Sequence, residues 1–295
     1  MSGADLVTPE LLARWRPPVV PEESDKETRG RVLVLAGGAQ VAGATLLTAV
    51  AALRAGAGKL QIAAPRSLAQ GLALAMPEAR VIAAPETPEG ELAPEAAELL
   101  EGALGRSRAA VIGPGMVEDG PAGELALRLV EAGGPPMVVD AAAMQGLVED
   151  PARASARHGE LVLTPHVGEM AGLLGCSKDE VAADPLALTR RAAAQWKAVV
   201  VLKAATTLVV SPDGKAWRHV GGHVGLATSG SGDVLAGIIA GLIARGAPPA
   251  QAAVWGVVAH GRAGGRLEAR IARLGFLARE LLDEVAPAIA ELGGA

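Results

Sequence analysis

The chain contains 295 residues, of which 50% are hydrophobic and 20% are charged, and its formal net charge is −5 at pH 7. This length allows a sizeable core in one large domain or two small ones, and the negative net charge argues against a general nucleic-acid binder. Only 2% of the residues are aromatic and tyrosine is absent. We therefore expect a core of Ala, Val, Leu and Ile, with no tyrosine available as a catalyst.

The cysteine content and the hydropathy pattern argue against several further classes of protein. Cys176 is the only cysteine, so an intramolecular disulfide and a multi-cysteine metal site cannot form. No basic segment followed by an apolar core begins the chain, and no apolar run approaches the roughly 20 residues of a membrane helix. We expect a cytoplasmic, soluble protein that binds neither nucleic acid nor a membrane.

Apolar runs of strand length alternate with helix-like stretches along most of the chain. Residues 1–28 form a polar, proline-containing lead-in, where Leu11, Leu12 and Trp15 predict a short docking helix. Arg31–Ala36 is the first expected strand. Further strands are expected at 60–63, 80–83, 109–112, 137–139, 160–163 and 199–202, a hairpin at 207–210 and 215–219, and helices at 44–55, 94–104, 123–131, 168–174, 185–196, 234–244, 249–267 and 276–292. Such alternation is typical of a mostly parallel sheet covered by helices on both faces, and it predicts a single α/β domain over residues 29–295.

Ligands of open α/β sheets bind beyond the carboxyl ends of the strands, so the residues that follow each expected strand are candidates for one common site. Lys203 is either a solvated lysine or a contact for a nucleotide phosphate. His166 either caps the helix that starts near Gly168 or contacts a substrate. Asp140 is predicted to cap a helix over 141–147 unless it meets Mg²⁺. The segments at these strand ends are Gly37–Ala44, Gly113–Gly115, Asp140, Thr164–Glu169 and Lys203–Thr207.

A glycine-rich stretch, Gly225–Gly237, leads through Ser231-Gly232-Asp233 into an apolar helix expected to begin at Val234. Its small residues leave backbone amides free to close on an anion, and the positive end of the helix dipole points to the same place. An acid there repels phosphate, but it is useful if Asp233 takes a proton from a hydroxyl that meets a phosphoryl group. The alternative is a glycine-rich turn in which Asp233 is an ordinary helix cap.

Several common motifs are absent from the sequence. It has neither the P-loop pattern Gly-x-x-x-x-Gly-Lys-Ser/Thr nor Gly-x-Gly-x-x-Gly after the first expected strand. Its five histidines fall in no metal-ligand spacing. These absences argue against a P-loop enzyme, a standard dinucleotide-binding fold and a histidine metal centre.

In this order, the motifs resemble those of the ADP-dependent NAD(P)H-hydrate dehydratase family, within the ribokinase-like superfamily of small-molecule kinases. The resemblance runs from about Gly30 to near the C-terminus. It rests mainly on Leu163–Met170, Val201–Ala204 and Ala227–Ile238. The resemblance implies a ribokinase-like fold and repair of hydrated NADH or NADPH, by phosphorylation of the hydroxyl followed by elimination of phosphate.

The resemblance also implies roles for individual residues. Asp233 is the implied base, and Mg²⁺ is implied between the phosphates, with ligands that the resemblance does not assign. ADP or ATP is the implied co-substrate. The resemblance implies an anion hole made by the amides of Gly230, Ser231 and Gly232. It implies contacts to the hydrated dinucleotide from Ala44, Gly115, His166 and Asp233. The implied contacts to the adenine nucleotide are Lys203, Ala204, Ala205, Thr206, Thr207 and Gly232.

By the same resemblance, we expect a homo-oligomer, a tetramer in the family, and a separate epimerase that supplies the S epimer. The chain departs from the common family pattern at Ala142, where many members have a second acid, at Ala204, where they have glycine, and over His219–Val224. Two other functions stay open: a ribokinase-like kinase of a small alcohol or vitamin precursor, and a non-catalytic nucleotide sensor or scaffold. The choices between ADP and ATP, and between the NADH and NADPH hydrates, stay open as well.

Overall fold

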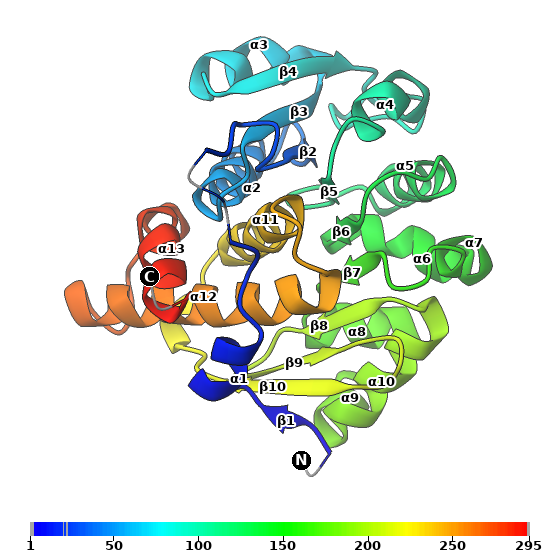
Figure 1. Ribbon diagram of the computed structural model, residues 1–295. Coiled ribbons are helices and arrows are strands. Elements are labelled where there is room, and N and C mark those ends of the chain that lie inside the picture. Colours follow the sequence, from blue (N-terminus) through cyan, green and yellow to red (C-terminus); the bar gives the residue numbers. More distant parts are fainter. Residues whose placement is uncertain (1–2, 20, 22, 294–295) are drawn as a thin grey trace.

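The computed structural model describes residues 3–19, 21 and 23–293, and its centre is one ten-stranded sheet (Figure 1). The strand order is β1-β10-β9-β8-β7-β6-β5-β2-β3-β4. Only the pairs that involve β9 are antiparallel; the other neighbours are parallel. The prediction of a mostly parallel α/β sheet is confirmed. The strands are β1 (Asp5–Leu6), β2 (Arg31–Leu35), β3 (Lys59–Pro65), β4 (Ala79–Ala84), β5 (Ala109–Ile112), β6 (Met137–Val139), β7 (Leu161–Leu163), β8 (Val199–Leu202), β9 (Thr206–Val210) and β10 (Ala216–Val220).

Helices cover both faces of the sheet, because each central strand is apolar on both sides. In β2, Val32 and Val34 pack into the core beneath α2, α11, α12 and α13, whereas Leu33 and Leu35 pack beneath α4, α5, α8 and α10. The helices are α1 (Pro9–Arg14), α2 (Gly43–Arg54), α3 (Arg66–Ala75), α4 (Ala96–Leu104), α5 (Asp119–Glu131), η1 (Ala141–Met144), α6 (Gln145–Glu149), α7 (Pro151–Ser155), α8 (Val167–Leu174), α9 (Lys178–Ala183), α10 (Pro185–Trp196), η2 (Val224–Leu226), α11 (Ser231–Ala244), α12 (Pro249–Arg270) and α13 (Ala278–Gly293).

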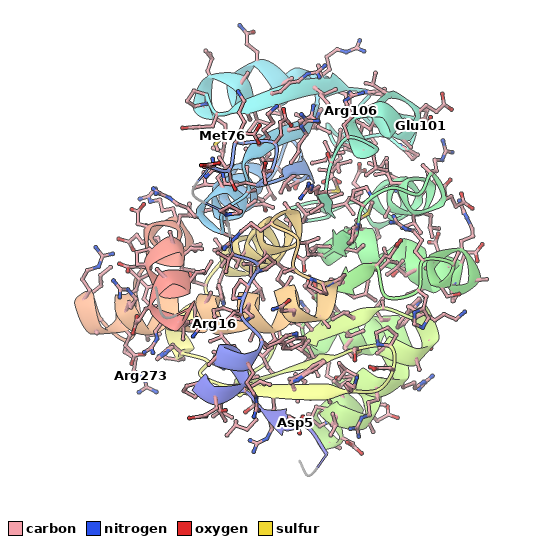
Figure 2. The ribbon with its side chains drawn as sticks, in the orientation of Figure 1. Asp5, Arg16, Met76, Glu101, Arg106 and Arg273 are labelled. Atoms are coloured by element: carbon pink, nitrogen blue, oxygen red, sulfur yellow. The ribbon has the colours of Figure 1, made fainter. Side chains whose placement is uncertain are left out.

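The lead-in contributes to the sheet and to the core. The predicted short helix is present as α1, and β1 extends the sheet edge by pairing with β10. The Trp15 ring packs on Trp217 with 5.1 Å between ring centroids. The carbonyl of Trp15 accepts hydrogen bonds from Trp255 Nε1 at 2.6 Å and Gln251 Nε2 at 2.9 Å. Residues 5–16, whose ends are marked by Asp5 and Arg16 in Figure 2, therefore tie the β10 edge to α12.

Within the described ranges, no helix is long and apolar enough to cross a membrane.

Candidate active site

The N-terminus of α11 forms one side of the candidate site. Gly230 is the N-cap of this helix and has φ +88°. A Cβ added at Gly230 would lie 2.6 Å from Leu47 Cδ1, so both the backbone and the space require glycine here. The helix begins at Ser231, three residues before the predicted start. Asp233 is therefore the third residue of the helix, and the interpretation of it as an N-cap is wrong.

The first turn of α11 offers amides to an anion, since the first N–H groups of a helix have no intrahelical acceptor. The Ser231 amide donates to the Thr228 carbonyl at 3.2 Å and closes a turn before the helix. Gly232 itself lies close to Lys203, because a Cβ added at Gly232 would lie 3.5 Å from Lys203 Nζ. A lysine ammonium and a helix N-terminus therefore converge on one point at the carboxyl edge of the sheet.

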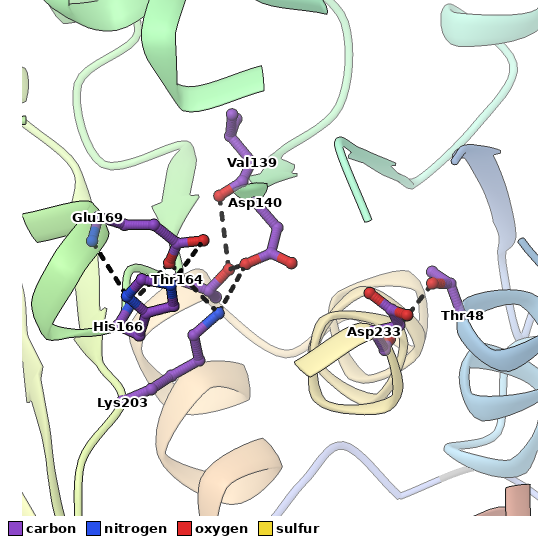
Figure 3. Close-up of polar contacts among 8 residues, drawn as sticks. All are labelled: Thr48, Val139, Asp140, Thr164, His166, Glu169, Lys203 and Asp233. Atoms are coloured by element: carbon purple, nitrogen blue, oxygen red, sulfur yellow. Dashed lines mark hydrogen bonds and ion pairs between the residues drawn. The ribbon is translucent and has the colours of Figure 1, made fainter. Parts of the chain in front are cut away.

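Asp233 is partly buried in this first turn. Its backbone carbonyl accepts a hydrogen bond from Thr48 Oγ1 at 3.3 Å, which fastens the turn to α2 (Figure 3). Burial and the negative charge of Asp140 together raise the pKa of Asp233 to about 7, against the opposing effect of Lys203. A carboxyl group with a pKa in this range can both accept and release a proton near neutral pH.

Asp140 follows β6 and is buried, with 3% of its surface exposed. Its Oδ1 atom lies 2.6 Å from Thr164 Oγ1 and 3.0 Å from Lys203 Nζ (Figure 3). Asp140 occupies the predicted N-cap position, before the 3₁₀ helix η1, but its side chain makes no capping hydrogen bond. The physical reason is that the buried carboxylate is satisfied by an ammonium and a hydroxyl, which bind it more strongly than a backbone amide does.

Lys203 lies at the end of β8 between two carboxylates. Its Nζ atom is 3.0 Å from Asp140 and 3.7 Å from Glu169 Oε2. Burial lowers the pKa of Lys203, but Asp140 and Glu169 outweigh burial and leave its pKa raised. The side chain therefore stays charged, and the reading of Lys203 as a freely solvated lysine is wrong.

His166 is the N-cap of α8 and forms a capping box with Glu169. The His166 Nδ1 atom accepts the Glu169 amide at 3.0 Å, and Glu169 Oε2 accepts the His166 amide at 2.6 Å. The His166 side chain is 58% exposed, so its ring remains accessible after the cap is made. Capping and a substrate contact are thus compatible.

The other predicted contacts lie on two sides of the cluster formed by Asp140, Glu169 and Lys203. Ala44 is the second residue of α2 and Gly115 follows β5, and the structure brings them together: a Cβ added at Gly115 would lie 2.3 Å from Ala44 Cβ. On the opposite flank, Ala204 and Ala205 form the turn between β8 and β9, closed by Thr207 Oγ1 donating to the Ala204 carbonyl at 3.1 Å. Thr206 begins β9.

The segment from His219 to Val224, where the chain departs from the family pattern, lies against α12. A Cβ added at Gly261 would lie 2.8 Å from His219 Nε2, and His223 Nδ1 lies 2.5 Å from Glu268 Oε2. Glycine on α12 thus makes room for the His219 ring, and the second histidine is held by an acid. Of the two rings only His223 is paired, because His219 Nε2 is buried without a hydrogen-bond partner among the described residues.

Sequence reasoning missed His260. This histidine is in the middle of α12, and its Nε2 atom lies 3.0 Å from the hydroxyl of Ser231 in the first turn of α11. Burial lowers the pKa of His260 to about 4, so the ring is neutral and acts as a hydrogen-bond partner rather than a cation. A single histidine in an apolar helix gives no sequence signal for such a contact.

A mostly parallel sheet, with the glycine-capped N-terminus of α11 near the Lys203–Asp140 pair at its carboxyl edge, gives the chain a ribokinase-like α/β fold. A model of the NAD(P)H-hydrate dehydratase family matches residues 32–287. The chain therefore belongs to the NAD(P)H-hydrate dehydratase family.

Individual relatives agree with this assignment. The ADP-dependent (S)-NAD(P)H-hydrate dehydratase of Xanthomonas campestris is 44% identical over 97% of this chain and 96% of that protein. The protein of the same name from Neisseria meningitidis is 37% identical over 90% of this chain and 86% of its own. The crystal structure of the ADP/ATP-dependent NAD(P)H-hydrate dehydratase from Bacillus subtilis, co-crystallised with ATP/Mg²⁺, superimposes with a TM-score of 0.83 at 27% identity, covering 99% of this chain and 100% of that one.

Proposed function

We propose that this protein is an ADP-dependent (S)-NAD(P)H-hydrate dehydratase, a hydro-lyase that repairs hydrated NADH and NADPH. The observation that carries the proposal is Asp233, a carboxyl group with a pKa of about 7 in the first turn of a helix whose N-terminus meets Lys203. Such a group can take a proton from a hydroxyl at the place where a phosphoryl group is held. The Xanthomonas and Neisseria relatives bear the name of this activity.

In the first step, the hydroxyl of the hydrated ring transfers its proton to Asp233. The hydroxyl oxygen bonds to the terminal phosphorus of ADP while the bond from that phosphorus to the bridging oxygen breaks and releases AMP. In the second step, the carbon–oxygen bond to the phosphate breaks with the help of the ring nitrogen's lone pair, and a neighbouring carbon loses a proton. The ring double bond is restored, and the sum is ADP plus hydrate giving AMP, phosphate and NAD(P)H.

Each flank of the cluster has a part in this reaction. The amides of Gly230, Ser231 and Gly232 surround the transferred phosphoryl group, for which the Ser231 amide would exchange its bond to the Thr228 carbonyl, and Lys203 compensates the charge of that group. The adenine nucleotide binds along Lys203–Thr207, beside Gly232. The hydrated dinucleotide contacts Ala44 and Gly115, which lie against each other on the flank away from Lys203, and His166, which lies beside Lys203 (Figure 3). This arrangement brings the hydroxyl and the phosphoryl group together in line, which is the main requirement of phosphoryl transfer.

Two carboxylates at the carboxyl edge of the sheet fit the needs of a Mg²⁺ ion. Among the described residues, no group of three or more His, Cys, Asp or Glu side chains could hold a metal by itself. Mg²⁺ needs only one or two carboxylates in addition to phosphates and water. Asp140 and Glu169, on either side of Lys203, supply that number. When bound there, Mg²⁺ neutralises charge on the phosphates.

The assembly and the metabolic partner are further parts of the proposal. We propose a homotetramer in solution and a coupled epimerase that converts the R epimer of the hydrate to the S epimer. The bifunctional NAD(P)H-hydrate repair enzyme Nnr of Escherichia coli is 37% identical over 93% of this chain but only 50% of its own length. A second activity in such relatives supports the pairing of the two functions.

The activity is tested by incubating the protein with hydrated NADH, Mg²⁺ and either ADP or ATP while following the return of NADH absorbance. Recovery with release of AMP and phosphate is expected in the ADP reaction, at a higher rate than with ATP. A stable phosphorylated product would instead identify a kinase of a small alcohol. Nucleotide binding without any product would identify a sensor.

The Asp233→Asn variant tests the role of the proposed base in the same assay. We expect it to lose on the order of 10²–10⁴ in rate, the usual contribution of a general base, while it still binds ADP. An Asp233→Asn enzyme with full activity would remove the proposed base.

A further inference from the structure

A cavity of about 270 Å³ adjoins the cluster around Lys203. It is formed where β5, β6 and β7 end, between the loop that begins at Met116, the turn η1 and the first two turns of α8. Met116 and Met144 are buried in its wall with 4% and 2% exposure, beside the methyl group of Ala142. The wall of the cavity is therefore closely packed behind a lining that combines small apolar and polar side chains.

The cavity is continuous with the proposed dinucleotide site. Glu169 lines it and also lies 3.7 Å from Lys203. Gly115, which contacts Ala44, directly precedes Met116. A dinucleotide whose hydrated ring meets Asp233 and whose linker passes Gly115 therefore has its other half next to this cavity.

We propose that this cavity binds the adenosine half of the hydrated dinucleotide and that its acidic rim makes the enzyme prefer hydrated NADH to hydrated NADPH. The inference rests on the proposed dehydratase function and extends it to the choice of substrate. The two substrates differ only by a phosphate on the adenosine ribose, so any discrimination between them arises where that ribose binds.

The rim has the donors and acceptors that an adenine edge needs. Gln145 is partly buried at the start of α6 and lines the cavity. A side-chain amide can donate to and accept from the adenine edge at the same time, as it does in the readout of adenine in DNA. Gln145 therefore provides orientation in the proposed site.

Charge on the rim opposes a 2′-phosphate. Asp119, the first residue of α5, and Glu169 line the cavity, and no lysine or arginine of the described part of the chain does. Lys203 already lies between Asp140 and Glu169, and Lys178 packs over Gly168 outside the cavity. Sites that accept a 2′-phosphate place an arginine near it. Here a phosphate would meet the Asp119 carboxylate.

The first experiment measures kcat/KM for hydrated NADH and hydrated NADPH under saturating ADP, so that the nucleotide site is filled. We expect the wild type to favour hydrated NADH about fivefold or more through KM, since two charges a few ångströms apart repel appreciably even in a wet site. Asp119→Asn should reduce this preference. Glu101→Gln removes the same charge from an acid that points outward on α4 (Figure 2), and it should leave the preference unchanged.

The second experiment separates the adenosine contact from the chemistry. Gln145→Leu should raise the KM for hydrated NADH about tenfold, the equivalent of one lost hydrogen bond in a site. Its effect on hydrated nicotinamide mononucleotide, which lacks adenosine, should be less than threefold. Calorimetric titration with unhydrated NADH and NADPH, again with ADP bound, should reproduce the preference and its loss in Asp119→Asn without any turnover.

The outcomes distinguish the two proposals. Equal binding of NADH and NADPH, or a Gln145→Leu effect of the same size on the mononucleotide, overturns the assignment of the cavity even when the protein is an active dehydratase. Absence of turnover for every hydrate, with the NADH preference still present in the titrations, rejects the proposed reaction and leaves the assignment of the cavity standing.

Discussion

At the scale of single residues, the central feature is the carboxyl group of Asp233. It lies in a partly buried helix turn, and both burial and the charge of Asp140 favour its protonated form. The backbone carbonyl of the same residue is held by Thr48. The structure thus fixes the position of this group firmly while making its ionised form costly.

This environment predicts the pH dependence of the reaction. A general base must be ionised, so kcat/KM should rise with pH and reach half of its plateau near pH 7, the pKa of Asp233. Asp140→Asn removes the negative charge that raises the pKa of Asp233 and leaves the opposing effect of Lys203 in place. The rise of kcat/KM should therefore move to lower pH. The measurement is a pH profile of kcat/KM for both proteins at saturating Mg²⁺.

Thr164→Val is the control for that shift. It removes the 2.6 Å hydrogen bond to Asp140 and keeps the charge, so the rise of kcat/KM should stay near its wild-type position. An Asp140→Asn profile that overlays the wild type would show that Asp140 does not set the pKa of Asp233.

The same carboxyl group predicts a gain in stability when it is replaced. In the unfolded chain an aspartate ionises near pH 4, whereas in the folded chain Asp233 ionises near pH 7. Between these values the folded state holds a proton that the unfolded state has lost, so unfolding free energy falls as pH rises through this window. Asp233→Asn should therefore be more stable than the wild type at about pH 8, by on the order of 2 kcal/mol, and nearly equal to it at about pH 4.

Urea unfolding of both proteins at the two pH values measures this difference. A variant that is less stable at the higher pH would mean that the carboxylate makes favourable contacts in the folded state that outweigh its burial.

At the scale of elements, α2 and α11 pack at unusually close range, and glycines of α11 permit it. A Cβ added at Gly237 would lie 2.3 Å from the Thr48 carbonyl oxygen, and one at Gly241 would lie 2.4 Å from the Ala52 carbonyl oxygen. Thr48 also donates to the Asp233 carbonyl. The packing distance between these two helices therefore sets the position of the proposed base.

Gly237→Ala should separate the two helices. We expect a loss of about 2 kcal/mol or more in unfolding free energy, because an overpacked core must shift its backbone, together with a fall in kcat as Asp233 moves. Gly71→Ala is the matched control: Gly71 is within α3 with nothing near its Cβ position, and the change should be neutral or stabilising by about 0.5 kcal/mol. Equal losses in both variants would contradict the role of the close packing.

The elements themselves were largely predictable, because buried parallel strands are short apolar runs and the flanking helices have their own period. β5, β6, β8 and α10 agree with their predicted ranges to the residue. The helix α3 was missed because it follows β3 without a turn residue, and the start of α11 was missed because its cap is a glycine with positive φ rather than an acid. A hydropathy pattern does not predict a backbone conformation of that kind.

The candidate site was predictable only in part. Strand ends and a glycine-rich turn located Asp233 and Lys203, since the fold brings the carboxyl ends of parallel strands together. The pairing of Asp140 with Lys203 and the contact of His260 with Ser231 depend on side chains from distant elements. Such contacts are decided by packing, which a single sequence does not show.

At the scale of the whole molecule, the N-terminal arm fastens one edge of the sheet to the helical layer beneath it. β1 adds a parallel strand to β10, and the carbonyls of Trp15 and Arg16 accept hydrogen bonds from α12. The hairpin of β9 and β10 is followed by the segment that leads to α11. The arm is thus connected, through β10, to the first turn of the helix that bears Asp233.

This connection predicts that the arm contributes to global stability through the Trp15 ring. Trp15→Ala removes the contact with Trp217, 5.1 Å away between ring centroids, while it keeps the backbone carbonyl that α12 binds. The expected loss is on the order of 1 to 3 kcal/mol in unfolding free energy, and Trp15→Phe, which retains an aromatic ring, should lose less than half of that. Denaturant titrations of the three proteins measure the series. An Ala variant as stable as the wild type would mean that the arm is held by its backbone hydrogen bonds alone, and the ring contact would then have no part in joining the β10 edge to α12.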